Sequence, residues 1–252
     1  MSALRLTRLV LVERGRRIVG LLAFALLFIA AGLTARMLVG EEGHVEVGEL
    51  FLIGGYPVVS ALLLLGWLLG RYPVIATLVL FAGLFSGDRS DGYARLYSVR
   101  PVSFLRVYGL RVLLLLALSF VLSAVLLPIF DVIMLGNWAG PATFVVIVCY
   151  VLVYAALTTL LSLFVRGEAW IALILALIAM VWDALRRANK LDFPAGVGEV
   201  ITFILPPQGS LFRVEGAFAA VQPIPWGDVA FILGYALVLF LAAAVLIVDR
   251  EI

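Results

Sequence analysis

Charged and aromatic side chains concentrate in residues 87–111, which read GDRSDGYARLYSVRPVSFLRVYGLR. Gly92 breaks one helix and allows a turn. Four residues after it recur at i, i+3, i+4, i+7 spacing on one helical face: Tyr93, Leu96, Tyr97 and Arg100. Such a helix would lie along a membrane surface, with tyrosines at headgroup level and arginines in water. Pro101 ends it and Ser103 can cap the next helix, so this segment is suited to surface binding.

Other chemistry has little support in the sequence. Cys149 is the only cysteine and His44 the only histidine, so no disulfide, His-rich metal site or Ser–His catalytic set can be assembled. No GxxxxGK[ST] phosphate loop occurs. We therefore expect no enzyme activity, no metal and no cofactor in this chain. A net charge of only +2 does not indicate a nucleic-acid partner.

The elements that must position this segment are membrane helices. Hydrophobic residues make up 65% of the 252 residues and charged residues 13%, against roughly 45–50% and about 25% in soluble domains. A bilayer core needs about 20 apolar helical residues. Runs of this kind occupy 18–39, 107–130, 142–165, 169–184 and 228–248, and a further apolar region, 51–87, is broken by Arg71, Tyr72 and Pro73. The composition predicts an all-α polytopic membrane protein.

Arginines near the span ends predict the orientation. Five arginines precede the first span and five lie in 89–111, so both segments are expected on the cytoplasmic side. The region 51–87 must then cross only once. We favour 74–87 as the second span and 51–69 as a re-entrant or bent element on the outer side. Seven full spans are the alternative, and they would place one arginine group outside.

The prediction is a single transmembrane domain over 1–252 with six crossings and both termini cytoplasmic. Its parts are an interfacial elbow helix (1–17), spans 1 and 2 with the bent or re-entrant element (18–87), a cytoplasmic coupling segment (88–106), spans 3–5 (107–184), an outer loop (185–227), and span 6 with a cytoplasmic tail (228–252). One cluster, Arg186–Arg187–Lys190, falls on the outer side against the charge rule. The outer loop could fold as short helices.

The stretch 87–111 resembles the signature of the ABC-2 type permeases, which are membrane subunits of ATP-binding-cassette transporters. That signature has an acidic–basic pair after the second span, a Gly three residues later, a Leu-rich amphipathic helix, then Pro and Ser. Those places are occupied here by Asp88–Arg89, Gly92, Leu96, Pro101 and Ser103. Asp88 stands where Glu is usual, Tyr93 where Thr or Ser is usual, and Arg100 where a small residue is usual. Arg106 or Arg111 would be the family's basic residue near the third span.

The resemblance implies an exporter that works as a dimer, usually of identical chains, in the cytoplasmic (inner) membrane. Separate cytosolic ATPase subunits would bind ATP and Mg, and membrane lipids would surround the spans. The implied ATPase-coupling residues are Asp88, Arg89, Asp91, Gly92, Tyr93, Arg95, Leu96, Tyr97, Arg100, Pro101, Ser103 and Arg106. Without the resemblance, an ordinary interfacial helix anchoring two spans would have the same pattern.

Two ionisable residues lie close to spans and are candidates for a substrate pathway, namely Arg71 and Asp183. Ionisable residues inside membranes are costly and often functional, although a position at the interface or in a loop would also explain both. A stand-alone channel or ion-coupled carrier, or a membrane assembly factor without transport activity, remains an alternative function. The substrate does not follow from the sequence.

Overall fold

The computed structural model describes residues 3–39, 70–90, 104–135, 138, 140–188, 196–219 and 222–249. Every regular element in these ranges is helical. The helices are α1 (Ala3–Val39), α3 (Tyr72–Phe81), α4 (Ser86–Ser90), α6 (Phe104–Leu135), α7 (Ala142–Ser162), α8 (Glu168–Arg187), α9 (Val197–Ile204), α10 (Gln208–Ala219) and α11 (Trp226–Asp249). The described part of the chain is all-α, as the composition predicts.

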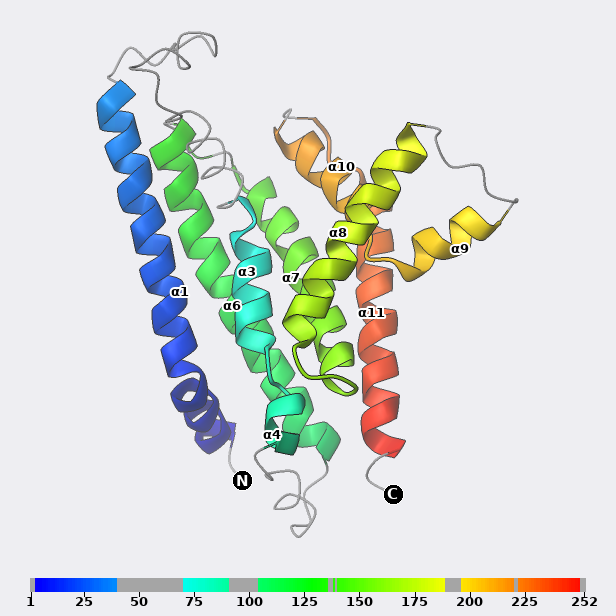
Figure 1. Ribbon diagram of the computed structural model, residues 1–252. Coiled ribbons are helices and arrows are strands. Elements are labelled where there is room, and N and C mark those ends of the chain that lie inside the picture. The colour runs from blue at the N-terminus through cyan, green and yellow to red at the C-terminus, as the bar shows by residue number, and fades with distance from the viewer. Residues whose placement is uncertain are drawn as a thin grey trace.

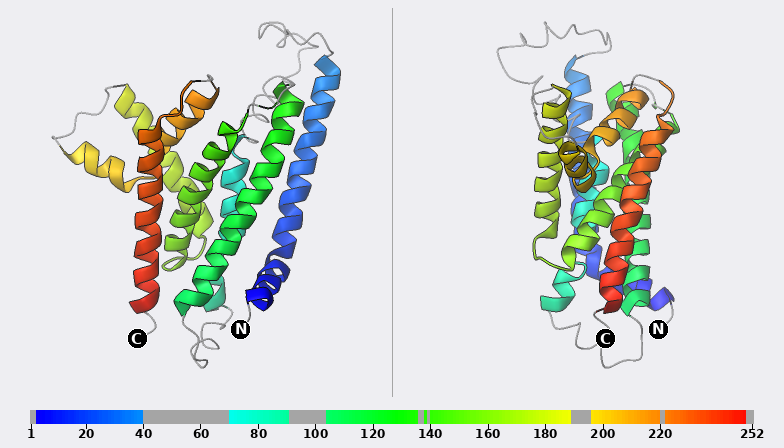
Figure 2. Two further views of the ribbon diagram at one scale, coloured as in Figure 1. Left: turned by 180° about the vertical axis from the view of Figure 1, so that it is seen from behind. Right: turned by 90° about the vertical axis from the view of Figure 1, so that its right-hand side faces the viewer.

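Helix α7 is the centre of the bundle, and α3, α6, α8, α10 and α11 all pack against it (Figure 1). Its sequence is an unbroken apolar run without Pro or Gly, and its buried residues lie on all sides of the helix. A helix that is apolar all round is typical of a buried or membrane position. Both chain termini and α4 lie at one end of the bundle, which we call the lower end; α10 and the end of α8 lie at the upper end (Figures 1 and 2).

Within the described ranges, four helices are long and apolar enough to cross a membrane: Leu105–Ile133, Ala142–Ser162, Glu168–Arg187 and Trp226–Val248. They correspond to the predicted third, fourth, fifth and sixth spans. Many of their large apolar side chains are exposed on the outer faces of the bundle, including Leu113, Ile174 and Leu237, as lipid contact requires. The structure is thus compatible with a multi-pass membrane protein, while six crossings and the orientation of the termini stay predictions.

The first predicted span and the elbow helix form one continuous helix, α1, whose first turns lie at an angle to the rest (Figure 2). The interfacial position of these turns stays a prediction. The stretch 51–69, expected to be re-entrant or bent, lies outside the described residues.

The stretch 74–87, favoured as the second span, is divided by a turn. Helix α3 ends at Phe81, because Ala82 takes an extended ψ of 130° and Gly83 a left-handed φ of +72°. Glycine adopts that φ without the steric cost that a Cβ would bring. The ten residues of α3 span only about 15 Å. Nearly all of α3 is buried between α1, α6, α7 and α8, so it is an internal helix of the bundle.

The described part of the predicted outer loop 185–227 contains the end of α8, the helices α9 and α10, and the first residues of α11. Helix α8 continues to Arg187, so Arg186 and Arg187 belong to its last turn. Cations are favoured there by the helix dipole, and Arg187 also pairs with Asp183 one turn earlier. Helix α10 lies obliquely at the upper end against α7, α8 and α11 (Figure 1).

Candidate functional site

An ion-pair cluster with a buried centre, Asp88 and Arg111, joins three helices at the lower end. Arg111 of α6 donates to Asp88 Oδ2 of α4 at 2.5 Å and to Glu13 Oε2 of α1 at 2.5 Å. Tyr108 donates its hydroxyl to the same Asp88 oxygen at 2.8 Å, and the Arg111 guanidinium lies 5.8 Å from the centre of the Tyr108 ring. Asp88 and Arg111 are 6% and 3% exposed. We call Glu13, Asp88, Tyr108 and Arg111 the clamp.

Arginines of α1 extend this cluster to the end of α3. Arg14 donates to the Ala82 carbonyl at 2.5 Å, and Arg17 donates to the carbonyls of Val79 and Ala82. These carbonyls have no helical partner because α3 ends there. Burial, the largest cause, lowers the pKa of Arg14 to about 10, so Arg14 is still charged at neutral pH. The first part of α1 is therefore fixed to the α3–α4 turn by cations on backbone oxygens.

A second set of bonds attaches the α7–α8 connection to the same turn. Glu168, at the start of α8 and 1% exposed, accepts the Gly83 N–H and the Ser86 hydroxyl. Arg89 donates to the carbonyls of Ser162 and Leu163, at the end of α7, at 3.1 and 2.8 Å. The short stretch 79–89 is thus bonded to α1, α6, α7 and α8.

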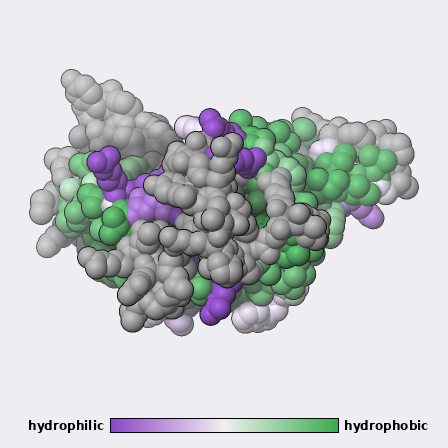
Figure 3. Space-filling model, turned by 90° about the horizontal axis from the view of Figure 1, so that it is seen from below, coloured by the Kyte–Doolittle hydropathy of each residue, from purple (hydrophilic) through white to green (hydrophobic). Residues whose placement is uncertain are grey.

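Hydrophilic residues appear at this lower end, with hydrophobic ones around them (Figure 3). Of the predicted coupling residues, Asp88 and Arg89 lie in α4, and Arg106 is exposed near the start of α6. Asp88 and Arg89 make the bonds described above. The basic residue of α6 that belongs to the clamp is Arg111 and not Arg106. The remaining predicted coupling residues lie outside the described residues: Asp91, Gly92, Tyr93, Arg95, Leu96, Tyr97, Arg100, Pro101 and Ser103.

An apolar cavity of about 720 Å³ lies between α3 and α8, with α7 behind it. We call it the groove. Its walls are mostly aliphatic, and Trp170 lies on the α8 side. Polar side chains lie at the two ends of the groove. Arg17 of α1 lies beside the end of α3, and around the start of α3 lie Arg71, Tyr150, Tyr154 and Gln208. An apolar cavity with few polar groups is the usual form of a small-molecule site.

Arg71, a predicted pathway residue, lies at the upper part of the groove in a polar cluster. It pairs with Glu215 of α10 at 2.7 Å and also bonds the Tyr150 hydroxyl of α7. Tyr150 donates to Glu215 at 2.7 Å, and the Arg71 guanidinium lies about 5 Å from the ring centres of Tyr150 and Phe212. Tyr150 is eight residues from the upper end of α7, roughly 12 Å along the helix. This cluster therefore lies well inside the apolar thickness of the bundle.

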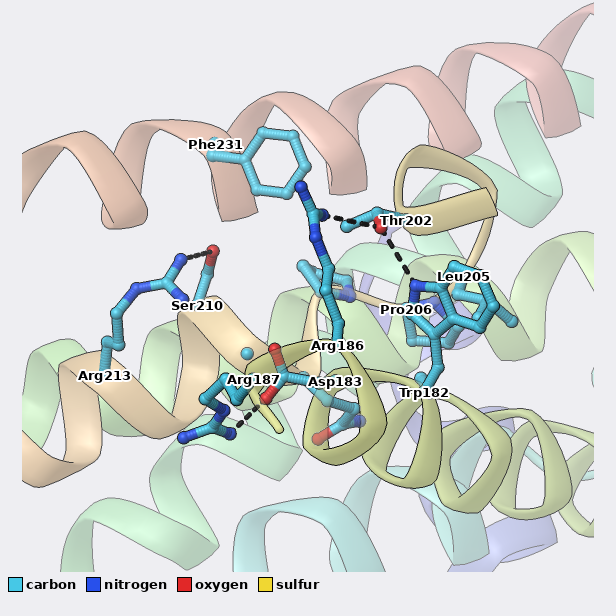
Figure 4. A pocket seen from close by; sticks show the side chains of 14 residues that line it. Trp182, Asp183, Arg186, Arg187, Thr202, Leu205, Pro206, Ser210, Arg213 and Phe231 are labelled. Carbon is cyan, nitrogen blue, oxygen red and sulfur yellow. Dashed lines mark hydrogen bonds and ion pairs between the residues drawn. The ribbon is translucent and has the colours of Figure 1, made fainter. Parts of the chain in front are cut away.

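Asp183, the other predicted pathway residue, lines a separate cavity of about 430 Å³ at the upper end (Figure 4). We call it the polar pocket. Its charged residues are Asp183, Arg186 and Arg187 of α8 and Arg213 of α10. The polar pocket and the groove share one lining residue, Gln208, which donates to the Tyr154 hydroxyl at 2.5 Å. Arg71 and Asp183 thus lie in neighbouring cavities.

Sequence reasoning missed Glu13, Glu168 and Glu215 as bonding partners. Each is a carboxylate beside or within an apolar helix, and that placement is itself a signal because such groups are costly without partners. Apart from Arg14, which pairs with its neighbour Glu13, their partners lie 65 to 144 residues away, so spacing could not identify them. Among the described residues, no three His, Cys, Asp or Glu side chains gather in a way that could hold a metal ion.

The fold and these sites define an all-helical protein compatible with a multi-pass membrane location, with a charged end, an apolar groove and a polar pocket. Comparison with known proteins adds no family: no family model, no curated protein and no solved structure matches the chain.

Proposed function

We propose that this chain is the membrane subunit of an ABC-2 type transporter, an exporter that works as a dimer and is driven by separate cytosolic ATPase subunits. The observation that carries the proposal is the bonding of the stretch 79–89 to α1, α6, α7 and α8. This stretch directly precedes the Arg-rich segment 91–103, which resembles the family's coupling element. A force applied to that segment would reach four helices at once.

The bonds supply a physical route from the segment to the groove. Arg89 bonds the end of α7, and Glu168, at the start of α8, bonds Gly83 of the turn. Arg17 bonds the end of α3. Helices α3 and α8 are the walls of the groove. A shift of the α3–α4 turn would therefore change the width of the groove, which is how ATP-driven motion could act on a bound substrate. Paired and packed elements favour discrete rearrangements of this kind over gradual deformation.

The first experiment is affinity purification from the native host in mild detergent. We expect an ATP-binding subunit to co-purify with the unsubstituted chain, and the double substitution Arg95→Glu, Arg100→Glu to remove it. Arg166→Glu is the matched control, because Arg166 is exposed in the α7–α8 connection at the same end and outside the coupling segment. Absence of any ATP-binding partner, or equal recovery with the double charge reversal, refutes the proposal.

One observation favours a second function, a stand-alone ion-coupled carrier. Carriers of this kind use ionisable residues at membrane depth, and the Arg71–Tyr150–Glu215 cluster supplies them. The two functions differ in their energy source. Vesicles containing only this chain would accumulate substrate in response to an ion gradient if it is a carrier, and Glu215→Gln would abolish that uptake. The ABC-2 subunit would need the ATPase and ATP.

A further inference from the structure

The polar pocket at the upper end is built from cations on two helices. Arg186 and Arg187 come from the last turn of α8, and Arg213 comes from α10 (Figure 4). Among the described residues that line the same cavity, Asp183 supplies the one carboxylate. Asp228, which pairs with Arg213, lies outside the lining. The wall therefore presents an excess of positive charge.

Two of these arginines are in ion pairs that cost little to rearrange. Arg187 pairs with Asp183, and Arg213 contacts Asp228 at 2.6 and 3.0 Å. Their side chains are 61% and 56% exposed. The partner carboxylates of Asp183 and Asp228 are 19% and 17% exposed, but water reaches the guanidinium side of each pair and screens it. A strong anion entering the pocket could recruit both guanidiniums without a large loss.

Arg186 differs from the other two, because its bonding partner among the described residues is neutral. Its Nη1 donates to the Thr202 hydroxyl of α9 at 2.9 Å, and that hydroxyl also accepts the Trp182 indole N–H at 3.0 Å. Figure 4 shows the Arg186 guanidinium between Thr202 and the Phe231 ring. No carboxylate lies within ion-pair distance of Arg186 in the described part of the chain. Among the described residues, therefore, no carboxylate neutralises this charge, which suits it to attract an anionic ligand.

The sequence gives an independent reason to expect a role for these cations. Arg186 and Arg187 belong to the cluster that violates the charge rule, and they lie at the end opposite both termini (Figure 1). Basic residues are normally sparse on that side of a membrane protein. A positive cavity there fits a binding requirement better than an orientation signal.

We propose that the polar pocket binds a phosphate group attached to an apolar or aromatic moiety. A phosphate has several charged oxygens that forked guanidiniums on opposite walls can share, whereas a carboxylate has two. Trp182 and Phe231 give the pocket an aromatic border. Leu205 and Pro206 line the same pocket, so the remainder of the ligand has an apolar surface to occupy. This binding needs no ATPase and is independent of the proposed transport function.

The test uses the full chain in phosphatidylcholine nanodiscs, titrated calorimetrically with phenyl phosphate, benzoate and phenol. We expect saturable binding of phenyl phosphate, weaker binding of benzoate and none of phenol. Arg186→Gln should weaken phenyl phosphate binding about tenfold or more, which corresponds to about 1.4 kcal/mol. Arg186→Lys should retain part of the affinity, because it keeps the charge but not the fork. Arg166→Gln, at the opposite end, should leave it unchanged.

Tryptophan fluorescence locates the binding site. Phenyl phosphate should change the emission of the unsubstituted protein, and this change should be absent in Trp182→Phe. Phosphatidic acid in the discs distinguishes two sources of the phosphate: competition with phenyl phosphate identifies a membrane lipid, and no competition identifies a soluble ligand. Either result supports the pocket's chemistry. The proposal is overturned if folded protein shows no saturable binding of phenyl phosphate, if Arg186→Gln binds it as tightly, or if benzoate binds equally well.

Discussion

Replacement of Arg111 by Met tests the clamp most directly. It removes the ion-pair partner of Asp88, which is 6% exposed, and among the described residues the Tyr108 hydroxyl is the remaining bond to the buried carboxylate. Removing one partner of a buried pair costs about 3–5 kcal/mol, because the remaining charge is desolvated. The Arg111–Glu13 pair adds little, since Glu13 is 37% exposed and screened. We therefore expect about 3–5 kcal/mol of destabilisation, nearly all from Asp88.

A double-mutant cycle separates the ion pair from general damage to α6. Asp88→Asn should cost less than Arg111→Met, because Arg111 keeps Glu13 and the amide can still accept from Tyr108. The double variant should be more stable than the sum of the two losses predicts, by about 2 kcal/mol, since neither charge is then left alone. Arg106→Met, at an exposed position on the same helix, should change stability by no more than about 0.5 kcal/mol. Equilibrium unfolding in mixed detergent–SDS micelles measures all four. Losses that add to within about 0.5 kcal/mol would refute the reasoning.

Two further substitutions test the packing around the sites. Gly209→Ala should destabilise the protein by about 1–3 kcal/mol, because a Cβ there would meet the Asp183 carboxylate. Gly216→Ala lies on the same helix but faces open space, so it should be neutral or should stabilise the protein by up to about 1 kcal/mol. Thermal unfolding of the two variants compares these effects. Glu168→Gln should reduce the stability of the protein by about 1–3 kcal/mol, because the bonds from Gly83 and Ser86 lose their charged acceptor. Backbone hydrogen exchange should then rise in the α3–α4 turn and not in α11. Unchanged protection of the turn would contradict the role given to Glu168.

The apolar runs predicted four long helices well, because a membrane helix satisfies its own backbone groups and its signal is local. The predicted runs 107–130 and 142–165 match α6 and α7 closely, and 228–248 matches α11. The break in 74–87 was harder to predict. Gly83 and the preceding Ala82 carry no strong turn signal, and the turn is held by Glu168, 85 residues later.

The clamp illustrates the same limit at the level of single residues. Asp88 could be selected as a site residue because a family pattern marks it. The family pattern also expects a basic residue near the start of the third span, either Arg106 or Arg111, but it does not pair that residue with Asp88. Packing places Arg111 inward beside Asp88 and leaves Arg106 exposed. Glu13, the other acidic partner of Arg111, lies on another helix and 98 residues earlier in the sequence. Local periodicity gives the face of a helix, but contact between faces depends on how the helices assemble.

The buried charged residues of the lower end and the apolar groove are related through the α3–α4 turn. A bundle stabilised only by apolar packing would not need Glu168 or Arg14 in its interior, since burying a charge is costly unless the charge is paired. These groups all bond the one stretch where α3 ends, and there the backbone groups without helical partners require other partners. The groove runs along α3, and its lining includes Ala82 and Arg17 beside the same turn. The polar lower end and the apolar cavity therefore meet at the α3–α4 turn. A substitution that weakens the bonds to the α3–α4 turn should accordingly alter ligand access to the groove as well as stability.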